Sequence, residues 1–185
     1  DFGLQLPPGS REVAEVRAQV ENAFSAAWRG EAEVDGFNAL VLTAGLTWRQ
    51  VVVLRAYAKY LRQAGTIYSQ EYMETTLLAY PGIAALLVAL FETRFDPGLR
   101  LGHEDRQLQS KELIAALNKQ LDSVHSLDQD RIVRSYLTLI TSTLRTSFFQ
   151  RDQGRPKSYV AFKLDPLSIP ELPAPRPKFE IFVYS

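Results

Sequence analysis

The sequence contains no cysteine, and its 21 basic and 21 acidic residues leave it without net charge. The lack of cysteine excludes disulfide bonds, thiolate catalysis and cysteine-ligated zinc, and is typical of a cytoplasmic protein. Because the charges balance, the chain as a whole carries no field that would hold nucleic acid or an anionic membrane. We therefore expect neither nucleic acid nor a membrane among its partners.

Recognisable catalytic motifs are also missing. The chain has no phosphate-binding loop, GxGxxG turn, nucleophile elbow or HExxH helix. His103, Glu104 and Asp105 are consecutive, so their side chains point in different directions and do not form a metal or acid–base site. His125 is better explained by the carbonyl groups at a helix C-terminus. We predict no catalytic, cofactor-binding or metal-binding residue, and hence no activity of this chain on its own.

Long hydrophobic runs and a signal peptide are absent as well. The longest uncharged run, from Thr75 to Phe91, is interrupted by Pro81 and Gly82. It falls just short of the roughly 18–20 residues that a membrane span requires. The start of the chain has neither the basic nor the apolar region of a signal peptide. The uncharged run is therefore predicted to form a buried pair of helices.

What the sequence does have is helical periodicity, which predicts a mainly α protein with a bundle of about six or seven helices over residues 9–150. The caps in this pattern are serine or threonine before a helix, and the breaker is glycine after it. The expected helices run from Ser10 to Gly30, from Asp35 to Gly45, from Trp48 to Gln63 after a cap at Thr47, from Ser69 to Tyr80, from Pro81 to Asp96, from His103 to Val124, and from a cap at Ser126 or Asp128 to about Phe148. Trp28 and Trp48 are expected to anchor the core.

After Gln150 the hydrophobic period changes from 3.6 to 2, which predicts a short C-terminal β segment. Residues 159–164 are expected to form one strand, and the proline-rich stretch 167–177 an extended connector. A second strand begins at Phe179, with Phe179, Ile181 and Val183 on one face and Phe182 and Tyr184 on the other; we expect both faces to be buried. A free edge this apolar is an aggregation hazard, so we interpret the chain as part of a larger protein.

This pattern divides the chain into four parts. Residues 1–8 would be a linker or the tail of a preceding module, 9–150 a helical domain, 151–178 a strand and proline-rich connector, and 179–185 the first strand of a following domain. Two surfaces are candidates for interaction. One is the apolar face of Phe179, Ile181 and Val183, and the other is the basic stripe of Arg55, Lys59 and Arg62 at helical spacing.

The basic stripe has two interpretations. The simpler one is a solvated or salt-bridged helix face, because the helices of a bundle normally display charge outward. In the alternative, the chain is an independent helical module that binds an acidic partner or a nucleotide through Arg55, Lys59 and Arg62. Charge reversal at these positions would distinguish the two.

A set of short segments, in this order and spacing, resembles the large bacterial NAD-specific glutamate dehydrogenases, in the region just before the catalytic domain. The segments are EVDGFN at 33–38, AGLTWR at 44–49, VLRAYAKYLRQ at 53–63, LFETRFDP at 90–97, SLDQDR at 126–131, FKLDP at 162–166 and PRPKFEIFVY at 175–184. The resemblance covers almost the whole chain.

The resemblance implies a parent enzyme that deaminates L-glutamate oxidatively to 2-oxoglutarate and ammonium and passes a hydride to NAD. It also implies that this chain is the last non-catalytic helical motif of that enzyme, with a structural, assembly or regulatory role. Its partners would be the catalytic and other domains of the same chain, within a homo-oligomer under allosteric control. No catalytic residue of the family can be carried over, because no matching motif is present.

Overall fold

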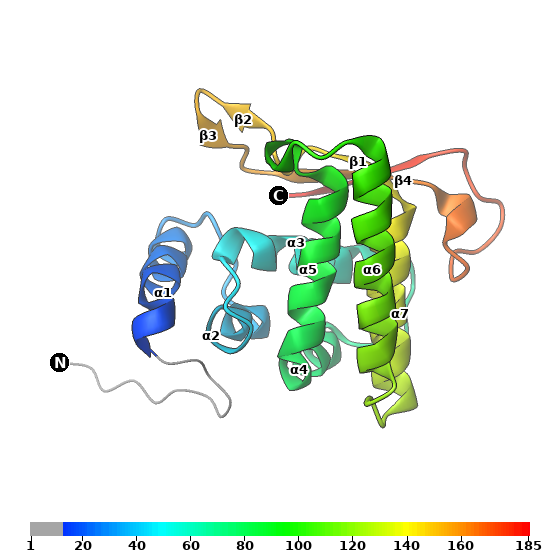
Figure 1. The fold of residues 1–185 in the computed structure, drawn as a ribbon, viewed down its shortest axis with the longest axis horizontal. Helices are drawn as coiled ribbons and strands as arrows, with labels where there is room; N and C mark the ends of the chain where they lie inside the picture. Colours follow the sequence, from blue (N-terminus) through cyan, green and yellow to red (C-terminus); the bar gives the residue numbers. More distant parts are fainter. Residues whose placement is uncertain (1–12) are drawn as a thin grey trace.

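The computed structural model describes residues 13–185, so the expected cap at Ser10 and the linker at 1–8 lie outside the described residues. Within that range the chain is mainly α, with seven α-helices before a short C-terminal β region (Figure 1). The prediction of a helical chain with a small β segment is confirmed.

The helices follow the predicted order, and the second one is a 3-10 turn that continues into one α-helical turn. The α-helices are α1 (Val13–Trp28), α2 (Leu40–Thr43), α3 (Trp48–Gln63), α4 (Gln70–Ala79), α5 (Pro81–Phe95), α6 (His103–Leu121) and α7 (Leu127–Ser142), and the 3-10 turns are η1 (Gly36–Ala39), η2 (Pro97–Leu99) and η3 (Pro166–Ser168).

The helix starts are determined by local side-chain caps. The Thr47 hydroxyl accepts from the backbone N–H of Gln50, and the Gln50 side chain accepts in return from the backbone N–H of Thr47, which makes a capping box at the start of α3. Ser69 and Ser126 cap α4 and α7 in the same way through single hydrogen bonds. The predicted bounds of α3 and these three caps are confirmed.

Helix α3 is the centre of the molecule. Nearly its whole length from Val51 to Leu61 is buried, and it packs against α4, α5 and α7. Figure 1 shows α5 and α6 side by side in front of it, with α1 at one side. One apolar core extends from Phe37 in η1 to Phe182 near the C-terminus. The helices and the β region therefore share a core.

The β region is a three-stranded antiparallel sheet in the order β1–β4–β5, built from β1 (Thr143–Thr146), β4 (Val160–Leu164) and β5 (Glu180–Tyr184). In β5, Phe182 is opposite Phe162 of β4. A separate two-stranded hairpin of β2 (Arg151–Asp152) and β3 (Arg155–Pro156) projects from the top of the molecule in Figure 1. The predicted strands at 159–164 and from Phe179 are thus present and pair with each other.

The predicted end of α7 was wrong. The helix stops at Ser142 instead of Phe148, and Thr143–Thr146 forms β1 against β4. The Thr143 hydroxyl donates to the carbonyl of Leu139, and the β-branched threonines here favour extended backbone. Leu144, which lies within the range predicted to be helical, is 45% exposed.

Two burial predictions were also wrong. Trp28 is 83% exposed and stacks on Phe24 along the outer side of α1, so it does not anchor the core. The face of β5 that carries Phe179, Ile181 and Val183 is exposed too, because no helix or strand in residues 13–185 packs on that face of the sheet. Only the Phe182 face is buried.

In residues 13–185 no single helix has the length and apolarity of a membrane span. Helices α4 and α5 reach that composition only as a pair, and they meet at an angle of 101°.

Candidate functional site

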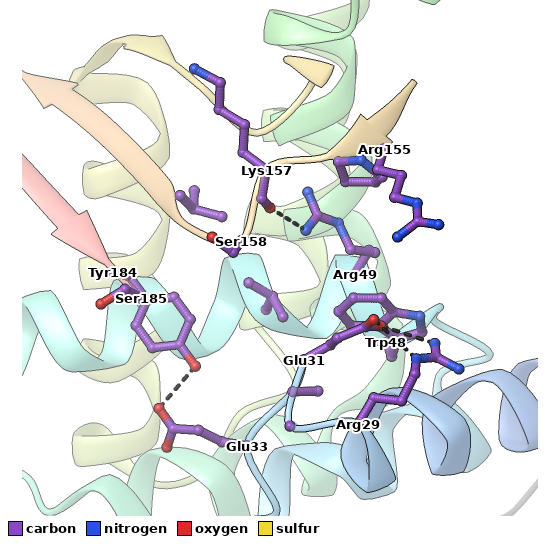
Figure 2. A pocket seen from close by; sticks show the side chains of 15 residues that line it. Arg29, Glu31, Glu33, Trp48, Arg49, Arg155, Lys157, Ser158, Tyr184 and Ser185 are labelled. Carbon is purple, nitrogen blue, oxygen red and sulfur yellow. Dashed lines mark hydrogen bonds and ion pairs between the residues drawn. The ribbon is translucent and has the colours of Figure 1, made fainter. Parts of the chain in front are cut away.

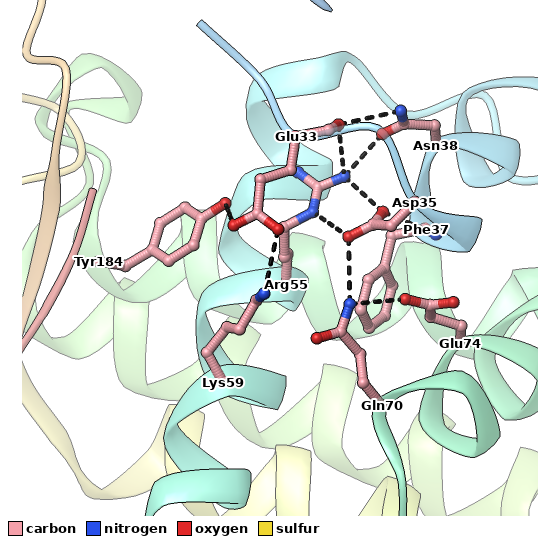
Figure 3. Close-up of polar contacts among 9 residues, drawn as sticks. All are labelled: Glu33, Asp35, Phe37, Asn38, Arg55, Lys59, Gln70, Glu74 and Tyr184. Atoms are coloured by element: carbon pink, nitrogen blue, oxygen red, sulfur yellow. Dashed lines mark hydrogen bonds and ion pairs between the residues drawn. The ribbon is translucent and has the colours of Figure 1, made fainter. Parts of the chain in front are cut away.

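The polar centre of the molecule is Arg55 on α3, whose side chain is fully buried. Its guanidinium group forms a bidentate ion pair with Asp35, with Nε to Oδ2 at 2.6 Å and Nη2 to Oδ1 at 2.7 Å (Figure 3). Nη2 also donates to the side-chain oxygen of Asn38 at 2.6 Å. Asp35 at the same time caps η1 through the backbone N–H of Phe37. This ion pair therefore attaches the 33–38 segment to α3.

A second layer of hydrogen bonds extends the network to α4. The Gln70 amide donates to Asp35 at 3.3 Å and to Glu74 at 2.8 Å. Beside this layer lies the hydroxyl of Tyr136, which is buried and has no hydrogen-bond partner among the described residues. Burial raises the pKa of Tyr136, and the charges of Glu74 and Asp35 raise it further. Tyr136 therefore stays protonated at neutral pH.

Glu33 connects the network to β5. Its two carboxylate oxygens accept from the Lys59 ammonium at 3.0 Å and from the Tyr184 hydroxyl at 2.9 Å. Burial alone would raise the pKa of Glu33, but the hydrogen bonds from Lys59 and Tyr184 outweigh it and lower that pKa. Glu33 is therefore a charged acceptor that joins α3 and the last strand.

A second set of contacts attaches the other end of β5 to α3. The Tyr60 hydroxyl donates to the carboxylate of Glu180 at 2.7 Å, and the Tyr60 ring packs edge-on against Phe182 at 5.4 Å between centroids. The pKa of Tyr60 is raised by burial and then by the charge of Glu180. Three residues of β5 thus contact α3 or the segment that α3 holds.

The structure corrects the predicted basic stripe. Arg55 is inside the protein and paired, so it is neither part of a solvated helix face nor available to an acidic partner. Lys59 is partly exposed but paired with Glu33, and Arg62 donates to the backbone carbonyl of Tyr68. The three side chains do not form one continuous open surface.

The second predicted surface lies on the outer side of β5. Ile181 is 68% exposed and Val183 is 56% exposed. Phe179 lies just before the strand, under the ammonium group of Lys163 at 3.9 Å from the ring centroid. This patch is exposed in the described chain, and its role as an interaction surface stays a prediction.

A cleft of about 780 Å³ opens between the loop that follows α1, the start of α3, the segment from the β2–β3 hairpin to β4, and the end of β5 (Figure 2). Trp48 forms part of its wall, and the side chains of Arg29, Arg49 and Arg155 lie around that ring. Arg29 is paired with Glu31 through two hydrogen bonds of 2.9 Å. The predictions from sequence did not include this cleft, because its residues come from four distant segments.

Metal binding has no support among the described residues. No group of three or more histidine, cysteine, aspartate or glutamate side chains in residues 13–185 is arranged to hold an ion. His103 is in the first turn of α6, where its ring contacts Gln107, and His125 lies between α6 and α7. That this chain is catalytically inactive stays a prediction.

Two family models match the chain. Residues 32–97 match the helical motif 3 of glutamate dehydrogenase, and residues 116–185 match the catalytic domain of bacterial NAD-glutamate dehydrogenase. The chain is also 46% identical over 184 residues to the NAD-specific glutamate dehydrogenase of Mycobacterium tuberculosis. The chain belongs to the bacterial NAD-specific glutamate dehydrogenase family. The predicted resemblance is confirmed.

Two further members of the family have the same degree of similarity. The NAD-specific glutamate dehydrogenases of Halomonas elongata and Pseudomonas aeruginosa are 46% and 47% identical, each over 187 aligned residues and the whole of this chain. The chain spans 11% of the M. tuberculosis and H. elongata glutamate dehydrogenases and 12% of the P. aeruginosa one. It therefore corresponds to a small part of each relative.

The two family matches divide the chain between residues 97 and 116. The apolar core is continuous across this division. The helical-motif match contains η1 and α2 to α5, and the catalytic-domain match begins at residue 116 within α6. The start of a new domain at 179 stays a prediction. Arg55, Asp35 and Tyr60 lie in the first match, whereas Glu180, Phe182 and Tyr184 lie in the second. The contacts between α3 and β5 therefore join the two matched regions.

Proposed function

We propose that this chain is a structural part of an NAD-specific glutamate dehydrogenase, in which helix α3 holds strand β5 of the region that matches the catalytic domain. The parent enzyme would deaminate L-glutamate oxidatively to 2-oxoglutarate and ammonium and pass the hydride to NAD. The observation that carries the proposal is the pair of hydrogen bonds from Tyr60 to Glu180 and from Tyr184 to Glu33. They attach both ends of one strand to one helix and to the segment bound to it.

The buried ion pair supports this structural role. Arg55 and Asp35 fix the 33–38 segment on α3, and Glu33 in that segment is the acceptor for Tyr184. Removing one partner of a buried pair leaves an uncompensated charge, so the segment has one strongly preferred position. Such a segment is suited to orienting a neighbouring strand, and the activity itself would come from residues outside this chain.

Removal of both tyrosine hydroxyls in the full-length protein that contains this chain tests the positioning role. We expect Tyr60→Phe combined with Tyr184→Phe to lower kcat for L-glutamate with NAD and to accelerate thermal inactivation. The matched control is Tyr159→Phe, because Tyr159 is an exposed tyrosine whose hydroxyl accepts only from Lys157 among the described residues. Unchanged kcat and inactivation rate in the double variant would contradict the positioning role.

The parent activity has its own test. The purified full-length protein should reduce NAD in the presence of L-glutamate and release ammonium in equal amount. If the protein reduces NAD with another amino acid but not with L-glutamate, the substrate assignment is overturned. The positioning role would then be tested with that other amino acid.

Assembly into a homo-oligomer and allosteric control are further proposals that depend on the family resemblance. If the α3–β5 contact transmits an effector signal, the tyrosine double variant should change the cooperativity of an effector titration as well as kcat. An unchanged cooperativity would limit the contact to a structural role. The independent acidic-partner module is not favoured by any observation, because Arg55 is buried and Lys59 is paired.

A further inference from the structure

Within residues 13–185, the cleft beside Trp48 has cationic side chains that lack carboxylate partners. Among the described residues, no carboxylate lies within ion-pair distance of the guanidinium groups of Arg49 or Arg155. The two acidic side chains of the lining are already used, Glu31 by Arg29 and Glu33 by Lys59 and Tyr184. The excess charge of this cleft is therefore positive.

Arg49 is held in place by neutral groups instead of a counter-ion. Its Nη1 donates to the backbone carbonyl of Lys157 and its Nη2 to that of Phe148, both at 3.2 Å. Its guanidinium carbon also lies over the rings of Phe148 at 4.9 Å and Trp48 at 5.5 Å. A guanidinium group has five N–H donors, so Arg49 has donors left for a ligand. Its side chain is thus oriented before any ligand arrives.

The local electrostatics favour an incoming anion. Burial lowers the pKa of Arg49, and the charge of Arg151 in the hairpin lowers it further. Arg155 is exposed at the rim of the cleft and belongs to the same hairpin as Arg151. With Arg49 and Arg151 it makes a group of three positive charges. An anion placed between these groups would offset their mutual repulsion, and at short range it would form charge-assisted hydrogen bonds.

We propose that the Trp48 cleft binds a small molecule that carries a phosphate group, with Arg49 and Arg155 as the phosphate ligands. The fork geometry of guanidinium matches phosphate oxygens, and a doubly charged group suits a cleft that contains more than one cation. A cleft of about 780 Å³ is within the range of small-molecule sites. The ring of Trp48 in the wall offers a surface on which a flat ring attached to the phosphate would stack.

The experiment is calorimetric titration of the full-length protein that contains this chain with phenyl phosphate and with inorganic phosphate. We expect one site per chain whose affinity falls at least about tenfold in Arg155→Glu. The matched control is Arg145→Glu, which makes the same charge change at an exposed arginine on β1, outside the cleft lining. A site with equal affinity in wild type, Arg155→Glu and Arg145→Glu would overturn the proposal, as would equal weakening by both variants.

A further variant, Trp48→Leu, tests the site without a change of charge. The titrations measure binding and not turnover, so their outcome does not depend on the proposed glutamate dehydrogenase activity. If the ligand has a ring, phenyl phosphate should bind more tightly than inorganic phosphate, and Trp48→Leu should remove that difference while retaining phosphate binding. Equal affinities for the two probes, both weakened by Arg155→Glu, would support a site that recognises the phosphate alone. Failure of both probes to bind would overturn the proposal.

Discussion

Two arginines of α3, six positions apart, have opposite surroundings. Arg55 is buried in the middle of the helix and all its charge is matched by Asp35, with Asn38 as a further acceptor. Arg49 is near the start of the helix, where it has only backbone carbonyls and aromatic rings as partners among the described residues. The comparison teaches that basic residues on one helix serve different purposes according to whether the tertiary structure supplies a carboxylate.

The largest expected effect comes from removing the carboxylate of the paired arginine. Asp35→Ala leaves the Arg55 charge buried without compensation, so we expect the free energy of unfolding to fall by about 3–5 kcal/mol. Denaturant unfolding of residues 1–185, followed by circular dichroism, measures it. The control is Asp35→Ala combined with Arg55→Met, which removes the buried charge and should be less destabilised than Asp35→Ala alone. A single variant more stable than the double one would contradict the role of the ion pair.

The inner and outer faces of β5 extend the same comparison to apolar side chains. Phe182→Ala removes a buried ring that packs on Tyr60, and we expect a loss of about 3 kcal/mol in the free energy of unfolding. Ile181→Ala on the exposed face should change it by less than about 0.5 kcal/mol. The same denaturant titration measures both. Equal losses would show that the outer face is covered in solution.

The unpaired arginine should matter less for stability than the paired network. Arg49→Met removes two hydrogen bonds to carbonyls but also a partly desolvated charge, so we expect a loss of only about 1 kcal/mol in the free energy of unfolding. Arg155→Glu at the exposed rim should change it by less than about 0.5 kcal/mol. A loss at Arg49 as large as that of Asp35→Ala would make Arg49 a structural residue and weaken the contrast with Arg55.

The last effect concerns Glu33, is small, and depends on pH. The pKa of Glu33 is lowered in the folded chain. Its contribution to the free energy of unfolding is therefore complete above the ordinary glutamate pKa of 4.5, and it is lost as the pH falls through the lowered pKa. Because the Glu33 side chain is 43% exposed, solvent screening limits the contribution to less than about 1 kcal/mol. Glu33→Gln should be slightly less stable than wild type at neutral pH and equally stable in acid. A difference in stability between Glu33→Gln and wild type that grows as the pH falls would contradict a lowered pKa of Glu33.

Local patterns in the sequence predicted the elements whose ends are determined by neighbouring residues. The capping box of Thr47 and Gln50 and the apolar spacing that follows specify α3 from Trp48 to Gln63 without long-range information. The end of α7 could not be predicted this way. Leu144 continues the helical spacing, but the backbone there pairs with β4, which lies about 20 residues further along the chain.

The candidate site was predictable only in part. The strand from Phe179 and its alternating faces were visible as a period of two, whereas the face that is buried depends on where α3 lies. The outward position predicted for Arg55 was wrong because helical spacing does not show that Asp35, 20 residues earlier, reaches the same side of α3. The Trp48 cleft combines four distant segments, and no local pattern indicates it.

By itself the sequence determined the helical class, the starts of α3, α4 and α7, the presence of two C-terminal strands and the glutamate dehydrogenase family. These properties depend on capping residues, on the period of apolar residues and on short segments read in order. Only the tertiary structure decided which arginine is paired, which face of β5 is buried and how that strand is attached to α3. The physical reason is that an ion pair or a buried face depends on the distance between atoms, and folding brings together residues that are up to 151 positions apart, as in the hydrogen bond from Tyr184 to Glu33.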